Sequence, residues 1–155
     1  MAIQLNDLVR EVLDAPSFGF VCTINESKQP VMTRVFGYKF DDPLTILTIY
    51  TYKKDALQVV DQLHDGSNIT ATISSAADFK TVQFKGTYNQ HADASNQELD
   101  IIRAHTARQA EILKMMGIPN EVFASWKYEP AVGISINVKE LFDQTPKINA
   151  GNKIN

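Results

Sequence analysis

Six stretches of the chain have strand patterns: five alternate apolar and polar residues with a period of two, and residues 44–51 are apolar and β-branched on both faces, as in a central strand. They cover residues 18–24, 31–40, 44–51, 68–75, 80–88 and 131–138. Turn-forming segments separate them, and helical patterns are inserted between some of them rather than after every one. We therefore predict an α+β, mainly β fold: a six-stranded antiparallel barrel with flanking helices, not a doubly wound parallel sheet.

The length of 155 residues, 44% of them hydrophobic, suits one domain with a sizeable core. Helical periodicity predicts helices over residues 6–13, 53–64 and 96–116, the last opened by a Ser95–Glu98 capping box. We place the domain at residues 1–142. Residues 143–155 are polar without a period, which predicts a tail that is irregular or orders only against a partner.

Charge and composition exclude several classes of function. The net charge is −3 and the basic residues form no long run, so we expect no nucleic-acid partner. The sequence has no signal-peptide pattern and no apolar run of about 18 residues, which predicts a cytoplasmic protein without a membrane partner. The single cysteine, Cys22, is predicted to lie in the core. The three histidines lack metal-ligand spacing, so no metal site is expected.

Arg34 conflicts with a purely structural role. Strict alternation puts it in one row with Met32, Phe36, Tyr38 and Phe40. A guanidinium in an apolar row needs an anionic partner. The next helix opens with Lys53 and Lys54, although a helix N-terminus favours anions. A bound phosphate explains both features, with the Thr51 hydroxyl as a further donor. The alternative is that Arg34 extends to a strand edge and the lysines are ordinary solvated residues.

Arg34 with Lys39 five residues on, then Tyr50-Thr51, then Lys53-Lys54, resembles the pyridoxamine 5'-phosphate oxidase-like, FMN-binding split-barrel family. The resemblance extends from about Phe18 to Tyr88, with a weaker similarity near Trp126. It implies a six-stranded antiparallel split β-barrel and an FMN cofactor. It also implies a homodimer whose cofactor site lies at the subunit interface.

The resemblance also assigns site residues. Arg34, Thr51, Lys53 and Lys54 would hold the phosphate, with Lys39 near the phosphate or the ring. Backbone groups of residues 33–35 and 49–50 would line the ring, and Trp126 would contact it from the second subunit. Without the resemblance, Trp126 reads as a core or dimer anchor. The full set of expected cofactor-binding residues is Thr33, Arg34, Val35, Lys39, Ile49, Tyr50, Thr51, Lys53, Lys54, Gln83 and Trp126.

Two departures from the family bear on activity. The oxidases end in a basic segment that binds the substrate phosphate, whereas residues 137–143 here contain no arginine or histidine. Thr81 stands where the family has a glutamine, although Gln83 lies two positions on. We therefore expect FMN-dependent oxidoreductase chemistry on an unidentified small molecule rather than pyridoxamine phosphate oxidation, and name no catalytic residue. The alternative is a non-enzymatic flavin-, deazaflavin- or haem-binding module on the same fold.

Overall fold

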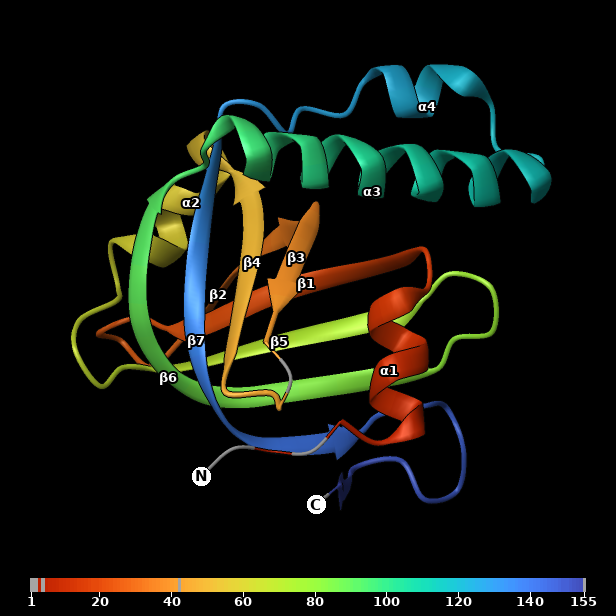
Figure 1. Cartoon of the computed structure of the whole chain (residues 1–155). Coiled ribbons are helices and arrows are strands. Elements are labelled where there is room, and N and C mark those ends of the chain that lie inside the picture. Colours follow the sequence, from red (N-terminus) through yellow and green to blue (C-terminus); the bar gives the residue numbers. More distant parts are fainter. Residues whose placement is uncertain (1–2, 4, 42, 155) are drawn as a thin grey trace.

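The computed structural model describes residues 3, 5–41 and 43–154. Its strands are β1 (Ser17–Ile24), β2 (Pro30–Val35), β3 (Gly37–Phe40), β4 (Ile46–Tyr52), β5 (Asn68–Ser75), β6 (Thr81–Asp93), β7 (Ala131–Asp143) and β8 (Asn152–Ile154). Its helices are α1 (Asp7–Asp14), α2 (Lys53–Val60), α3 (Asn96–Met115) and α4 (Asn120–Ala124). The antiparallel sheet has the order β2-β1-β5-β6-β7-β4-β3, with β8 paired to β7. It curls around an apolar interior, while α3 and α4 lie across one outer side (Figure 1).

The predicted fold class is confirmed, but the described residues form eight strands instead of six. The predicted strand 31–40 is divided at Phe36, because β2 pairs with β1 whereas β3 pairs with β4. Residues 35–38 are all buried as the chain crosses between these partners. The prediction that Arg34 and Tyr38 share one face is therefore wrong: alternation holds only within one pairing, and Tyr38 belongs to the barrel core.

The prediction that Cys22 of β1 lies in the core is also wrong. The row containing Phe18 and Cys22 faces outward, and in it Phe20 and Ile24 are 52% and 56% exposed. The inner row carries smaller residues: Ser17, Gly19, Val21 and Thr23. Space explains the choice at Gly19, where an added Cβ would lie 2.8 Å from the Thr72 carbonyl oxygen. Cys22 is half-buried on the outer face, where desolvation raises the pKa of its thiol.

The helices begin where the sequence predicts. The Asn6 side chain accepts a hydrogen bond from the Val9 amide at 2.9 Å and caps α1. The capping box of α3 is present in both directions between Ser95 and Glu98. Helix α2 ends at Val60, earlier than the predicted residue 64. Within the described ranges, no helix has both the length and the apolar character needed to cross a bilayer.

The C-terminal segment contains a strand that the sequence pattern does not reveal. Residues 152–154 form β8 and pair with the end of β7, so the prediction of an irregular tail is wrong for these residues. Ile154 packs against the barrel core. Three residues are too few to establish a period of two, which is why the strand was missed. The division of the domain at residue 142 stays a prediction.

Two apolar clusters fix the surroundings of the site. The larger fills the barrel and includes the inner residues of β4 and β7. The smaller lies between the outer face of these strands and α3, and consists of Phe36, Tyr50, Ile102 and Ala131. Trp126 and Tyr128 pack against its edge. Helix α3 and the segment that follows α4 therefore cover the part of the sheet next to Arg34.

Candidate functional site

Arg34 lies on the outward side of β2, half-buried among aromatic rings. Its guanidinium carbon is 4.3 Å from the centroid of the Trp126 ring, 4.7 Å from that of Phe36 and 5.4 Å from that of Phe18. Such contacts each contribute about 0.5–2 kcal/mol. The Nη2 atom is buried and has no hydrogen-bond partner among the described residues. Burial lowers the pKa of Arg34, although a guanidinium remains charged at neutral pH.

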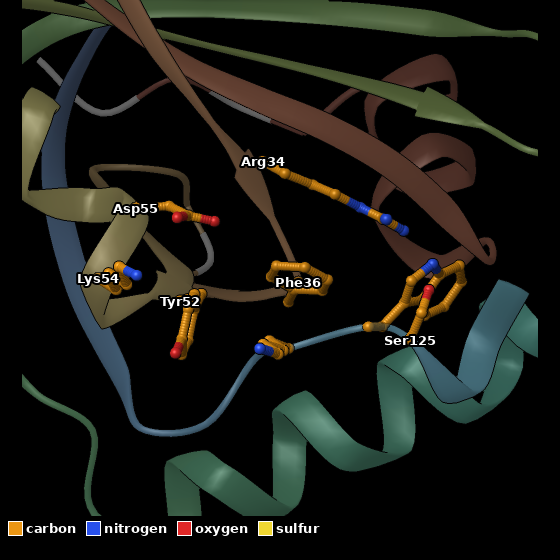
Figure 2. A pocket seen from close by; sticks show the side chains of 8 residues that line it. Arg34, Phe36, Tyr52, Lys54, Asp55 and Ser125 are labelled. Carbon is orange, nitrogen blue, oxygen red and sulfur yellow. The ribbon is translucent and has the colours of Figure 1, made fainter.

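A cavity of about 460 Å³, the Arg34 pocket, opens beside this side chain. Its lining comes from β2, the β4–α2 junction and the segment after α4, and consists of Arg34, Phe36, Tyr52, Lys54, Asp55, Ser125, Trp126 and Lys127. Three cations face one carboxylate, so the pocket is electropositive. Figure 2 shows the Arg34 side chain pointing toward Ser125, with Lys54 and Tyr52 on the other side of Phe36. An anion would fit the unsatisfied donor, because a buried polar group without a partner costs about 1–3 kcal/mol.

The two lysines at the start of α2 have different surroundings. Lys54 lines the Arg34 pocket. Lys53 forms an ion pair with Asp93, with Nζ 2.7 Å from Oδ2. Successive helical residues point about 100° apart, so neighbouring lysines can have different surroundings. Helix α2 also lacks a side-chain cap at its N-terminus. Of the residues predicted to contact the phosphate, Arg34 and Lys54 therefore line the same pocket, whereas Lys53 is paired with Asp93.

Thr51 does not reach the Arg34 pocket. It is fully buried, and its hydroxyl is 3.2 Å from the buried Thr33 hydroxyl. The side chains of Val35 and Ile49 lie in the barrel core. For Thr33, Val35 and Ile49 the resemblance implied backbone contacts only, and these stay predictions.

Lys39 lies in a different cavity. Its Nζ donates to Glu98 Oε1 at 2.6 Å, and the Tyr50 hydroxyl donates to the same oxygen at 2.9 Å. The Lys39 pocket has a volume of about 270 Å³ and is lined by Lys39, Ile46, Thr48, Asn89, Gln90, His91, Ala92, Glu98, Gly133 and Ser135. Burial of Glu98 raises the pKa of its carboxyl, but hydrogen bonds from Lys39, the Ser95 amide and Tyr50 outweigh this and lower it to about 2. Burial and the neighbouring Glu98 raise the pKa of Tyr50.

Gln83 also lies away from Arg34. Its amide nitrogen donates to the Thr72 hydroxyl at 3.3 Å, and its amide oxygen accepts from Gln144 at 3.5 Å. These contacts place it across β5, β6 and the end of β7. Of the expected set, only Arg34, Lys54 and Trp126 line the Arg34 pocket. Neither Gln83 nor Lys39 is brought together with them.

Five lining residues were missed: Phe36, Tyr52, Asp55, Ser125 and Lys127. Asp55 and Lys127 each adjoin a residue that was singled out, and their charges were the available signal. The segment after α4 has no period from which its direction could be read. The part of the chain that the structure describes contains no group of three or more His, Cys, Asp or Glu residues placed to hold a metal ion.

No protein-family model matches the sequence, and no curated protein matches it significantly. Solved structures share its fold. HupZ of Group A Streptococcus has a TM-score of 0.54 at 13% identity, covering 96% of this chain and 100% of that one. A protein related to general stress protein 26, of the pyridoxine phosphate oxidase family from Clostridium acetobutylicum, has a TM-score of 0.50 at 15% identity, covering 96% and 91%. The chain has the pyridoxamine phosphate oxidase-like split-barrel fold. An F420 reductase matches the same split barrel with a TM-score of 0.52 at 9% identity, covering 85% of this chain and 94% of that one.

Proposed function

We propose that this split barrel binds FMN, with the phosphate held by Arg34 and Lys54. The observation that carries the proposal is the buried Arg34 Nη2 without a partner, at the wall of an electropositive cavity. A phosphate oxygen would satisfy that donor, and Lys54 would add a second charge. Such charge-assisted contacts contribute about 1.5–3 kcal/mol each. The contacts that the resemblance implies for Thr33, Val35, Lys39, Ile49, Tyr50, Thr51, Lys53, Gln83 and Trp126 stay predictions.

Bound FMN would supply electron and hydride transfer, and the proposed activity is that of an oxidoreductase acting on a small molecule. The contribution of this chain is binding. Arg34 and Lys54 would fix the phosphate end, and the aromatic side chains of Phe36 and Tyr52 would shield the cavity from water. The described residues around the Arg34 pocket suggest no general acid or base beyond Asp55, which is exposed.

We further propose a homodimer that covers the outer face of β1 and β2. Phe20, Ile24 and Met32 are each at least half exposed there, which is unusual for a large apolar row on one face. The row adjoins the site, because Phe20 is paired with Arg34 in the sheet register. A second copy would bury it and bring a subunit boundary to the Arg34 pocket. In analytical ultracentrifugation, Met32→Glu should convert the dimer to a monomer. The control is Leu57→Glu, at an exposed position on α2, which should leave the dimer intact. A monomeric wild-type protein would refute the homodimer.

The experiment for the cofactor is a visible absorption spectrum after adding FMN and removing the excess, followed by titration of Arg34→Ala. Flavin bands should stay with the wild type. Arg34→Ala should weaken binding by about 1–3 kcal/mol, roughly 5- to 150-fold in Kd. Arg108→Ala is the matched control, because Arg108 is exposed and donates to the Asp14 carbonyl far from the pocket. Equal FMN affinity in Arg34→Ala and the wild type would refute the phosphate site.

The second candidate is a binding module without turnover, for a flavin, a deazaflavin or haem. The fold shared with an F420 reductase makes the deazaflavin F420 the natural competitor of FMN. Parallel titrations with FMN, F420 and haem separate these ligands, since each has a distinct absorption spectrum. Reduction of the bound flavin by NADH or NADPH would support the oxidoreductase. A bound flavin that neither nucleotide reduces, and that oxidises no candidate amine, would favour the module.

A further inference from the structure

The segment that carries Trp126 is weakly attached to the barrel. Helix α4 contains no buried residue and has no side-chain cap. The Ser125 hydroxyl and the Trp126 amide make local bonds to Val122 and Phe123. Beyond these, the part from α4 to Trp126 is held by the Trp126 indole and by Lys114 Nζ over the Phe123 ring at 5.9 Å. The chain is anchored after Trp126, where the Tyr128 ring lies 5.9 Å from that of Phe36 and Glu129 forms a two-bonded ion pair with Arg103 at 2.7 and 2.8 Å. Residues 120–126 include no fully buried side chain, so this part can leave the barrel at low cost while Tyr128 stays in place.

Of the three rings around the Arg34 guanidinium, the Trp126 indole is the nearest. It lies at 4.3 Å from the guanidinium carbon and makes an edge contact with Phe18, at 6.4 Å between ring centroids. The guanidinium points toward Ser125, away from Lys54 (Figure 2). Because Nη2 is covered, no anion can reach it until a neighbour moves. Among the groups that surround Arg34, Trp126 is on the least anchored segment, whereas Phe18 and Phe36 belong to the sheet or adjoin it.

We propose that Trp126 and α4 form a gate over the anion site, closed by the contact between the indole and Arg34. An anion binds when the gate swings out and frees Arg34 to turn toward Lys54. The proposal rests on the proposed function in placing an anion at Arg34, and adds a closed state that competes with it. Binding then selects the open state, so the observed affinity is the intrinsic affinity reduced by the open fraction.

Trp126 is the only tryptophan, so its fluorescence reports on the gate directly. The probe is inorganic phosphate, since a flavin would itself quench the indole. Opening should make Trp126 more accessible to acrylamide, with a rise of about twofold in the quenching constant at saturating phosphate. Potassium chloride at equal ionic strength should cause no rise, and Arg34→Met should abolish the response. A quenching constant that phosphate leaves unchanged or lowers overturns the gate.

Affinity distinguishes a gate from a ligand contact. If Trp126 closes the site, Trp126→Ala should tighten phosphate binding by about tenfold in calorimetry; if it helps to hold the ligand, the same change weakens binding and overturns the gate. Arg103→Ala removes the ion pair with Glu129 but alters no residue that lines the pocket. It should favour the open gate and tighten phosphate binding by about two- to threefold. This variant replaces Trp126→Ala as the test if Trp126→Ala does not fold. Unaltered affinity in both variants, with FMN still bound through Arg34, overturns the gate and leaves the proposed function intact. Absence of phosphate and FMN binding in all proteins overturns both.

Discussion

The Arg34 pocket and the Lys39 pocket each contain a cation that the family resemblance places at the cofactor, Arg34 at the phosphate and Lys39 near the phosphate or the ring, but among the described residues only the second cation is paired with a carboxylate. Arg34 is surrounded by aromatic rings and has a donor without a partner. Lys39 is 2.6 Å from Glu98, whose carboxylate also accepts from Tyr50. A positive charge is available to a ligand only where the protein does not neutralise it. The difference therefore comes from the partners of each cation and not from its residue type.

The largest difference between the two pockets should appear in stability, with opposite signs. Arg34→Met removes a desolvated charge and an unsatisfied donor while keeping apolar contact, and should stabilise the protein without cofactor by about 1–3 kcal/mol. Lys39→Met leaves the half-buried Glu98 without its cation and should destabilise it by about 1 kcal/mol. Urea unfolding measures both. A loss of stability in Arg34→Met would mean that the aromatic contacts, and not a ligand, are the reason for this arginine.

Acid unfolding tests the contribution of Glu98, the partner of Lys39, to stability. The pKa of Glu98 in the folded protein, about 2, lies below the unfolded value of about 4.3, so its stabilisation is present above pH ~4.3 and is lost as the pH falls toward 2. Glu98→Gln should cost about 1–2 kcal/mol at pH 7, and the difference from wild type should shrink steadily as the pH falls from about 4.3 through 2. Glutamine can still complete the capping box with Ser95, so the change reports on charge. A difference that is independent of pH would contradict this account.

The fold class could be predicted because the alternation that marks a strand is a local pattern, visible in residues that are neighbours in the sequence. The sequence also placed Arg34 and Lys54 at one site, and both line the Arg34 pocket, whereas the anion expected there stays a prediction. It failed where the outcome depends on distant partners: Glu98, which neutralises Lys39, lies 59 residues away, and Asp93, which binds Lys53, lies 40 residues away. Local pattern carries no information on such pairs. The break at Phe36 was missed for the same reason, since a change of strand partner is a long-range event.

The smallest predicted effect separates two adjacent residues of one type. Lys54 lines the Arg34 pocket, whereas Lys53 is paired with Asp93. Lys54→Ala should weaken FMN binding by about 0.5–1 kcal/mol, roughly two- to fivefold, because an exposed lysine contributes a solvated and screened charge. Lys53→Ala should change the affinity by less, and the difference between the variants should shrink as salt is raised from 50 to 500 mM, roughly from a 14 Å to a 4 Å screening length. Equal losses of affinity in both variants would mean that the lysines act through the electrostatic potential of the pocket and not through direct contact with the phosphate. A larger loss in Lys53→Ala would show that FMN binding displaces Asp93, and would restore both lysines to the phosphate site.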